Sequence, residues 1–320
     1  MESPKKGPNG EEGPPVTTNT VFSQQRIVAW RPLFTPFCTT FILFLLGGIL
    51  IIIGVLLYVY LAHLPFYDIR YDNICGNDNE CGITFTINEE IKGNIYMHYK
   101  LTNFHQNHRR YIFSKSDNQL RGEYVKYESM TECGDFRSVN ESKEPADLLL
   151  PSGAVALSLF NDTFAWKNTS IANFSEAGIS WRSDRDKLFK RLSSNYTEGI
   201  KWLIEDNETF PNDQRNEHFI VWMRAAALPV FYKVYSRCIN CYLPAGEYSI
   251  AIQNNYPVSL FNGEKHIVIS KVTNFGGKNS FIGLTYIIVG AVILLFGFIV
   301  LISQIFFPRE LGDTSILKKL

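Results

Sequence analysis

Two long runs of uncharged, apolar residues constrain this chain more than any other feature of its sequence. The runs are residues 37–62 (FCTTFILFLLGGILIIIGVLLYVYLA) and 281–307 (FIGLTYIIVGAVILLFGFIVLISQIFF), and neither contains Asp, Glu, Lys, Arg or His. A membrane-spanning helix needs about 20 apolar residues to cross about 30 Å of hydrocarbon. Buried helices of soluble proteins seldom stay uncharged for so long, so both runs are predicted to span a membrane.

The positions of the two runs predict the topology. The first run begins too late, and is too long, for a cleaved signal peptide, so we expect it to remain as an anchor. With two spans, both termini lie on one side of the membrane and residues 63–280 lie on the other. Positive charge near the spans favours cytosolic termini only weakly. The flanking cations are Arg26, Arg31, Arg309, Lys318 and Lys319 on the terminal side and Arg70, Lys271 and Lys278 on the other.

Glycosylation sequons and cysteines favour a lumenal or extracellular position for residues 63–280. Asn-x-Ser/Thr triplets without proline occur at Asn140, Asn161, Asn168, Asn173, Asn195 and Asn207. Five of the six cysteines, Cys75, Cys81, Cys133, Cys238 and Cys241, lie in the same region. N-linked glycans and disulfides both form in the oxidising secretory compartments. The predicted order is therefore a cytosolic tail (1–36), a span (37–62), an ectodomain (63–280), a span (281–307) and a cytosolic tail (308–320).

The ectodomain sequence favours strands. In CGITFTI (81–87), apolar Ile83, Phe85 and Ile87 alternate with threonines, which is the period of a half-buried strand. Asn262-Gly263 stands between YPVSLF and HIVISKV and predicts a type I′ hairpin turn. DKLFKRLSS and HFIVWMRAAAL are candidates for short helices. The predicted fold is a β-rich ectodomain with short helices between two transmembrane helices.

Both apolar runs carry glycines seven residues apart. The positions are Gly47 and Gly54 in the first run and Gly283, Gly290 and Gly297 in the second. Seven residues are close to two helical turns, so these glycines share one helix face. Small residues let helix backbones approach closely in lipid. The stripes are predicted to pack the two helices on each other or on a larger membrane partner.

No motif in the chain predicts catalysis. A nucleophile elbow, a phosphate-binding Gly-Lys-Ser/Thr loop and a His-Glu-x-x-His pair are all missing from the sequence. The spans also lack the ionisable residues that mark a transport pathway. We therefore expect neither an enzyme nor a transporter acting alone, and no cofactor.

The stretch GNIYMHYKLTNFHQNHRRY (93–111) raises two further hypotheses. His105 and His108, together with the Cys-x-x-Cys pair Cys238 and Cys241, offer ligand types that zinc prefers. A metal site would require the two pairs to meet, and an oxidising lumen favours a disulfide instead, so no metal is expected. The adjacent arginines 109 and 110 do not indicate nucleic-acid binding, because the domain is lumenal and the net charge is zero.

Several sequence blocks occur in an order that resembles one known family. They are QQRIVAWRP before the first span, the 93–111 stretch, FNDT (160–163), FIVWMRAAALP (219–229), LPAGEYSI (243–250), NNYPV (254–258) and GGKNSFIG (276–283). Together they resemble the Cdc-fifty/Lem-three family, the accessory β-subunits of type-IV P-type ATPases that act as lipid flippases. The resemblance covers about residues 23–300 and implies an antiparallel β-sandwich-like ectodomain.

The resemblance also implies a function. Such a subunit has no active site of its own and forms a heterodimer with the catalytic ATPase subunit in a lipid membrane. It supports export of the complex from the endoplasmic reticulum, and it is needed for ATP-driven movement of phospholipid from the outer to the cytosolic leaflet. The expected locations are the endoplasmic reticulum, Golgi, endosomes and plasma membrane.

For individual residues, the resemblance implies a glycan at Asn161 and a fold or partner role for Phe104, Asn107, Arg109 and Arg110, of which we favour the fold. It also implies a disulfide from Cys133, but its usual partner is replaced by Ser152. Cys133 is then either free or paired with Cys238 or Cys241, and Cys75 with Cys81 can close a small loop.

Two other classes compete with the accessory subunit. One is a self-assembling, two-span trimeric channel, which usually has more ectodomain cysteines and a polar pore face. The other is a stand-alone adhesion or lectin-like membrane protein, for which the sequence offers no binding mechanism.

Overall fold

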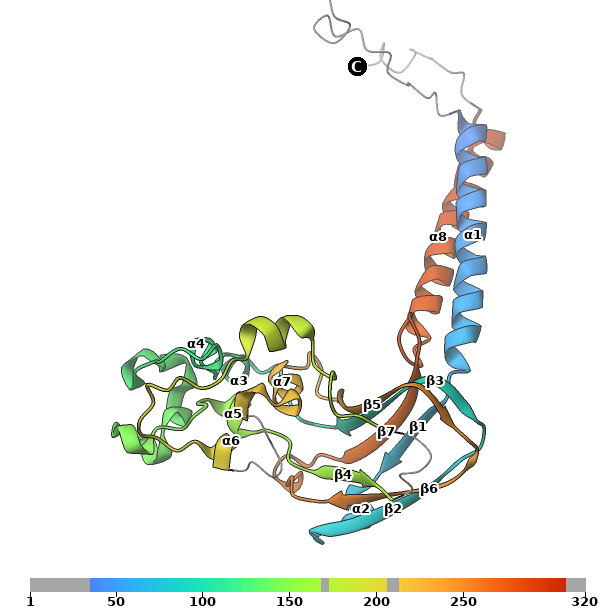
Figure 1. Cartoon of the computed structure of the whole chain (residues 1–320). Helices are drawn as coiled ribbons and strands as arrows, with labels where there is room; N and C mark the ends of the chain where they lie inside the picture. Colours follow the sequence, from blue (N-terminus) through green and yellow to red (C-terminus); the bar gives the residue numbers. More distant parts are fainter. Residues whose placement is uncertain (1–34, 168–172, 206–212, 309–320) are drawn as a thin grey trace, which may run out of the picture. The chain divides into compact units, whose positions relative to one another are not determined.

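A computed structural model of the chain describes residues 35–167, 173–205 and 213–308 (Figure 1). Its contacts divide the chain into two compact units. The first comprises the described residues up to Val55 and from Thr285, and the second comprises Leu56–Leu284. The sequons at Asn168 and Asn207 lie outside the described residues.

Two long apolar helices occupy the predicted spans. Helix α1 is Pro36–Ala62 and helix α8 is Phe281–Phe306, and both are long and apolar enough to cross a membrane. In the first unit, a Cβ atom added to Gly290 would lie 2.9 Å from the carbonyl oxygen of Gly47, and one added to Gly297 would lie 3.3 Å from the Cβ of Leu43. The glycines therefore let the two helices pack directly against each other.

The remaining glycines of the two stripes also lie in packed positions. Within the second unit, a Cβ on Gly283 would come 2.6 Å from the backbone nitrogen of Tyr58, and Gly54 of the first unit is buried. Of the two roles predicted for the stripes, the structure shows packing between the two helices.

The second unit contains two antiparallel sheets. The first sheet has the order β1-β7-β3-β5, and its strands are β1 (Phe66–Arg70), β7 (Lys265–Val272), β3 (Ile91–Leu101) and β5 (Phe231–Leu243). The second sheet has the order β2-β6-β4, with β2 (Glu80–Ile87), β6 (Gly246–Gln253) and β4 (Thr163–Trp166). The predicted fold class is confirmed.

One hydrophobic core lies on the inner faces of these sheets. Ile83, Phe85 and Ile87 of β2 are buried in it, whereas the intervening threonines are exposed. Ile95 and Ile269 belong to the same core from the first sheet. The alternation that identified β2 in the sequence is thus the alternation between core and solvent.

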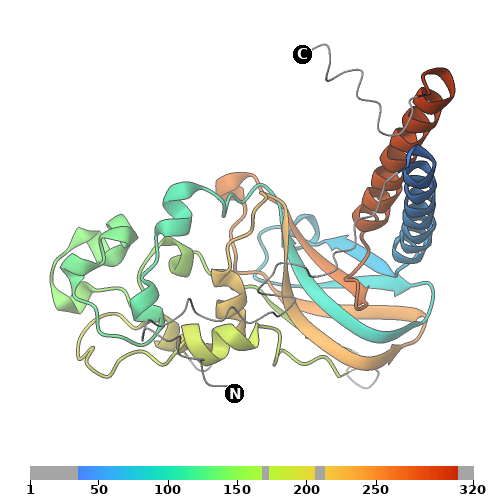
Figure 2. The same cartoon turned by 90° about the horizontal axis from the view of Figure 1, so that it is seen from above.

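Residues 102–230 form a lobe of short helices and turns beside the strands, apart from β4, which joins the second sheet (Figures 1 and 2). Its helices are α3 (Arg109–Phe113), α4 (Asp117–Leu120), α5 (Ala154–Leu157), α6 (Trp202–Glu205) and α7 (Glu217–Met223). Tighter turns occur at Tyr127–Ser129, Thr131–Arg137, Val139–Glu141, Pro145–Asp147 and Asp213–Arg215, and a wider one at Asp184–Leu188. A further short helix, α2 (Asp72–Cys75), follows β1.

The predicted type I′ hairpin at Asn262-Gly263 is wrong. Strand β6 ends at Gln253 and belongs to the second sheet, while β7 begins at Lys265 in the first. Only Asn262 of the pair has a left-handed backbone (φ 51°), and it ends a single turn over Ser259–Phe261. The connection crosses between the two sheets, and its residues 254–256 bind a buried ion pair.

Candidate functional site

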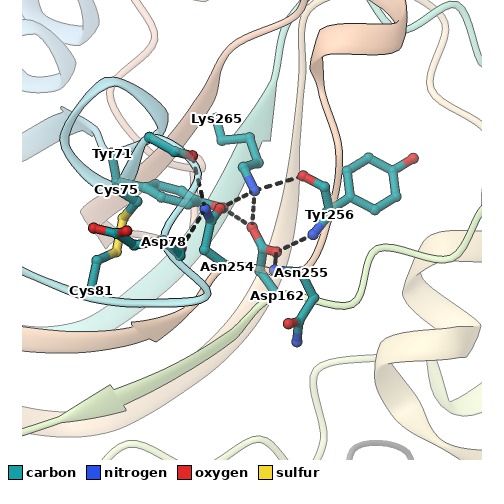
Figure 3. Close-up of a disulfide and its surroundings, with 10 residues drawn as sticks. Tyr71, Cys75, Asp78, Cys81, Asp162, Asn254, Asn255, Tyr256 and Lys265 are labelled. Atoms are coloured by element: carbon teal, nitrogen blue, oxygen red, sulfur yellow. Dashed lines mark hydrogen bonds and ion pairs between the residues drawn. A yellow bond between two sulfur atoms is a disulfide. The ribbon is translucent and has the colours of Figure 1, made fainter.

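A buried ion pair lies at the centre of a polar cluster in the β body (Figure 3). The ammonium group of Lys265, at the start of β7, lies 2.6 Å from the carboxylate of Asp162, and their side chains are 2% and 0% exposed. Lys265 also donates to the side-chain oxygen of Asn254 (2.6 Å) and to the carbonyl oxygen of Tyr256 (2.7 Å). All three ammonium protons therefore have acceptors, which a buried charge requires.

The carboxylate of Asp162 is equally well satisfied. It accepts hydrogen bonds from the Tyr71 hydroxyl and from the backbone N–H groups of Asn255 and Tyr256, each at 2.6 Å. Burial, followed by the nearby Asp162 carboxylate, raises the pKa of Tyr71 well above its usual value. The phenol consequently stays protonated and serves as a donor.

Asn254 connects the ion pair to a loop that is closed by a disulfide. Cys75 of α2 is bonded to Cys81 of β2, and the side-chain amide of Asn254 donates to the carbonyl oxygen of Asp78 inside this loop, at 3.0 Å. Figure 3 shows the disulfide and the ion pair on either side of Asn254. The FNDT and NNYPV blocks thus meet here and join the two sheets.

This arrangement holds the fold together. Each polar atom of the ion pair is used by another group of the chain, so it offers no unpaired acid, base or nucleophile to a substrate. Within residues 35–167, 173–205 and 213–308, no group of three or more His, Cys, Asp and Glu side chains could hold a metal ion. The cluster is best described as a structural centre.

The 93–111 stretch divides into two parts. Its first part forms β3, a central strand, and then a turn in which Phe104 packs 5.1–6.3 Å, between ring centroids, from Tyr111, Trp222, Phe231 and Phe261. The side-chain amide of Asn107 donates to the carbonyl oxygen of Ala227 at 2.9 Å. Phe104 and Asn107 therefore connect the end of β3 to the segment before β5.

The second part is exposed. Arg109 and Arg110 begin α3 with exposed side chains, and neither forms an ion pair with any residue that the structure describes. His105 and His108 are also exposed, and Cys238 is bonded to Cys241 within β5. The structure does not bring these histidines and cysteines together as zinc ligands. Arg109 and Arg110 are therefore exposed and accessible to a partner, as are the two histidines.

Cys133 has a free thiol in the structure. It is fully buried with Met130, Leu148, Leu150 and Tyr196, and burial raises its pKa to about 12. Ser152 is buried as well, and its hydroxyl lies 3.8 Å from the sulfur of Met130. The only other free cysteine among the described residues is Cys38 in α1. Pairing of Cys133 with Cys238 or Cys241 is therefore not observed.

The described sequons differ in exposure. Asn140, Asn173 and Asn195 are exposed, whereas Asn161 is partly buried next to Asp162. Their glycosylation stays a prediction.

Asp162, Asn254 and Tyr256 lie in the FNDT and NNYPV blocks, but no pattern in the sequence predicts the ion pair. Lys265 was missed because a lysine at a strand end normally faces solvent.

Two helices that are long and apolar enough to cross a membrane, together with a disulfide-bonded, two-sheet body, define an integral membrane protein. The family model described as "LEM3 (ligand-effect modulator 3) family / CDC50 family" matches residues 37–310, which include nearly all of both helices and the whole region between them. The chain therefore belongs to the CDC50/LEM3 family, whose members are non-catalytic accessory subunits.

Curated relatives agree along nearly the full length. The chain is 35% identical to Cell cycle control protein 50A of Mus musculus, over 92% of either chain. It is 34% identical to ALA-interacting subunit 3 of Arabidopsis thaliana, over 92% of this chain and 88% of the relative. It is 31% identical to Cell cycle control protein 50B of Homo sapiens, over 92% and 95%.

Proposed function

We propose that this chain is the accessory β-subunit of a phospholipid flippase and forms a heterodimer with a type-IV P-type ATPase. In this role it supports export of the ATPase from the endoplasmic reticulum and ATP-driven movement of phospholipid from the outer to the cytosolic leaflet. The main support is the family match over residues 37–310, because it includes the spans as well as the ectodomain. The similarity to a plant protein named as an interacting subunit points to the same kind of partnership.

The distribution of polar groups supports a non-catalytic role. The buried charges of Lys265 and Asp162 serve the fold, and the described parts of both membrane helices contain no ionisable side chain other than Cys38 and tyrosines. Hydrolysis of ATP and the lipid pathway would then belong to the partner. In this proposal the ectodomain lies in the lumen or outside the cell and carries N-linked glycans, and the complex resides in the endoplasmic reticulum, Golgi, endosomes and plasma membrane.

Affinity purification in mild detergent tests this proposal. A tag on the full chain should recover a multi-span ATPase, and co-expression of the two should raise uptake of fluorescent phospholipid into cells compared with either protein alone. Recovery of a homotrimer without an ATPase would contradict the proposal and favour the two-span channel.

A pair of glycine variants refines the same experiment. Gly290→Leu should abolish recovery of the ATPase, because a side chain at Gly290 collides with Ile51 (2.7 Å from its Cβ position) and separates the two helices. Gly48 has no neighbouring atom within 4 Å of its Cβ position. Gly48→Leu adds the same side chain to the same bundle and should leave the helix pair intact. Normal recovery with Gly290→Leu would show that close packing of α1 and α8 is not needed for assembly.

A further inference from the structure

We propose that the turn Thr273–Gly276, together with Lys271 and Lys278, binds the phospholipid headgroup layer on the ectodomain side of the membrane. This contact would be separate from the two spans. The inference rests on the topology of the proposed function but not on the ATPase partner.

The turn is small and well braced. Thr273 and Gly276 exchange two backbone hydrogen bonds of 2.9 Å, and Gly276 has a φ of 98° that suits glycine. The Thr273 hydroxyl donates to the Gly276 carbonyl oxygen (2.9 Å) and accepts from the Phe275 amide (3.3 Å). Phe275 lies at the tip with 57% of its surface exposed. A rigid turn that presents a phenylalanine to its surroundings suggests a surface for it to enter.

The connections of the turn place it near the ends of both membrane helices. α8 begins at Phe281, and the backbone N–H of Lys271 donates to the carbonyl oxygen of Pro65 (3.1 Å), which follows α1 by three residues. Because a chain extends by at most about 3.5 Å per residue, Phe275 lies within about 20 Å of the first residue of α8. Both short linkers therefore restrict the turn to the region where the chain leaves the membrane.

The helix ends show where that region lies. Tyr58 and Tyr60 of α1 are 42% and 51% exposed, and Phe281 of α8 is 71% exposed. Aromatic side chains of this kind concentrate at the boundary between hydrocarbon and headgroups. Phe275 is an exposed aromatic residue close in the chain to this group, and it belongs to the same unit, Leu56–Leu284.

The charge of the segment fits phosphate. Residues 271–281 (KVTNFGGKNSF) contain two lysines and no acidic residue. Neither lysine forms an ion pair with a residue of the described ranges. Lysine side chains near a membrane are attracted to anionic lipid, and their apolar stems can lie along the acyl boundary. A lipid surface offers both hydrocarbon for the exposed phenylalanine and phosphate for the two unpaired lysines. An acidic protein groove or an apolar one would match only one of these features.

The opposite end of β7 supplies a matched control. Leu260 is 84% exposed on the turn that precedes Lys265. The pocket beside that turn is lined by Asp72 and Glu264, both of which form ion pairs with Arg70. Since β7 runs from Lys265 to Val272, the two turns are separated by the length of a strand, about 25 Å at 3.3 Å per residue. Leu260 should therefore remain in water when Phe275 contacts lipid.

Quenching by brominated phosphatidylcholine tests the contact in the full chain reconstituted alone in nanodiscs. Phe275→Trp and Leu260→Trp each add one fluorophore to five native tryptophans, whose emission is subtracted with the parent chain. The added emission of Phe275→Trp should be lost in brominated discs, and that of Leu260→Trp should be retained. Equal quenching at both positions, or none at Phe275→Trp, would overturn the proposal.

A charge variant separates the lysines from the phenylalanine. In the Phe275→Trp background, Lys271→Gln with Lys278→Gln should reduce quenching, and it should remove any increase caused by adding phosphatidylserine to the discs. Unchanged quenching would exclude the lysines from the contact. Peptide mapping of the Cys75–Cys81 and Cys238–Cys241 bonds checks that each variant is folded. Because no ATPase is present, failure of this test differs from failure to recover a partner.

Discussion

The β body and the lobe of residues 102–230 belong to one compact unit but are stabilised differently. The β body has seven antiparallel strands, including β4 from within the lobe's sequence range, two disulfides and the buried Lys265–Asp162 pair. The described lobe has helices of at most seven residues and no disulfide. Its segments are joined by buried side chains that bond to backbone, such as Trp222 to the Val155 carbonyl oxygen (2.8 Å).

The difference follows from where backbone groups find partners. Strands satisfy one another in register, whereas a helix of one or two turns leaves most of its terminal N–H and C=O groups unpaired. In the lobe, the Gln214 side-chain amide donates to the carbonyl oxygens of Gln119 (3.1 Å) and Leu120 (3.2 Å) for this reason. In the lobe, hydrogen bonds from individual polar side chains thus satisfy backbone groups that neighbouring strands would satisfy in a sheet.

The largest expected effect comes from the ion pair of the β body. Lys265→Met leaves the Asp162 carboxylate buried without a cation, so it should lower the free energy of unfolding by about 3–5 kcal/mol. Thermal unfolding of the purified chain in detergent measures this. Lys92→Met removes a lysine from the exposed pair with Glu90 and should change little. Equal effects of the two variants would show that burial of the pair does not matter.

The lobe of residues 102–230 can be given a disulfide, which the β body already has, by one substitution. In Ser152→Cys, a disulfide to buried Cys133 would close the loop between these positions and raise stability by about 3 kcal/mol. Non-reducing peptide mapping should find the bond, and a reductant should cancel the gain. Ser152→Ala is the control that loses the hydroxyl without adding a thiol. Two alkylatable thiols after oxidation would show that the positions are too far apart.

Acid should affect the β body through His98. Burial lowers the pKa of His98 from 6.5 to about 4. As the pH falls, His98 is protonated in the unfolded chain before it is protonated in the folded chain. The contribution of neutral His98 to the free energy of unfolding is therefore fully present above pH 6.5 and is lost as the pH falls towards 4. The free energy of unfolding should fall by about 3 kcal/mol over this pH range because of His98.

The measurement is the unfolding midpoint between pH 6.5 and pH 4. His98→Phe keeps a ring beside Tyr96 and should flatten the acid decline, whereas His105→Phe, at an exposed position of the lobe, should not. A decline of the same slope in His98→Phe would assign the acid sensitivity to other groups.

The smallest effects on stability concern the 93–111 stretch, where the β body meets the lobe. Asn107→Ala removes the bond to Ala227 and should cost about 1 kcal/mol. Arg109→Ala and Arg110→Ala should leave unfolding unchanged, because both side chains are exposed without an ion pair in the described structure. If the arginines contact the ATPase, only their loss should reduce its recovery at full stability.

The sequence predicted best where a residue pattern repeats over a whole element. The uncharged runs located α1 and α8 to within one residue, and the alternation in CGITFTI located β2. The prediction of a hairpin at Asn262-Gly263 was wrong because a two-residue turn signal depends only on neighbouring residues. The assignment of β6 and β7 to different sheets depends on residues far away in the sequence. In the segment HFIVWMRAAAL, the helix ends at Met223. Arg224 has an extended backbone, and its guanidinium group donates to the Asp184 carboxylate.

The structural centre was harder to predict for a related reason. Asp162 and Lys265 are typical surface residues by type, and no spacing rule connects positions 103 residues apart. The resemblance to a family marked FNDT and NNYPV as important without indicating that they bind each other. Only the arrangement of the two sheets gives the charges a common, buried position.

The same pair has a consequence for the order of biosynthesis. Asp162 bonds to Tyr71, made 91 residues earlier, and to Lys265, made 103 residues later. Translation makes the N-terminal part of the second unit first, and a buried carboxylate without its cation is unfavourable. The two sheets therefore cannot close around Asp162 until β7 has been synthesised, only a few residues before α8. Completion of the two-sheet core thus coincides with synthesis of the second candidate membrane helix.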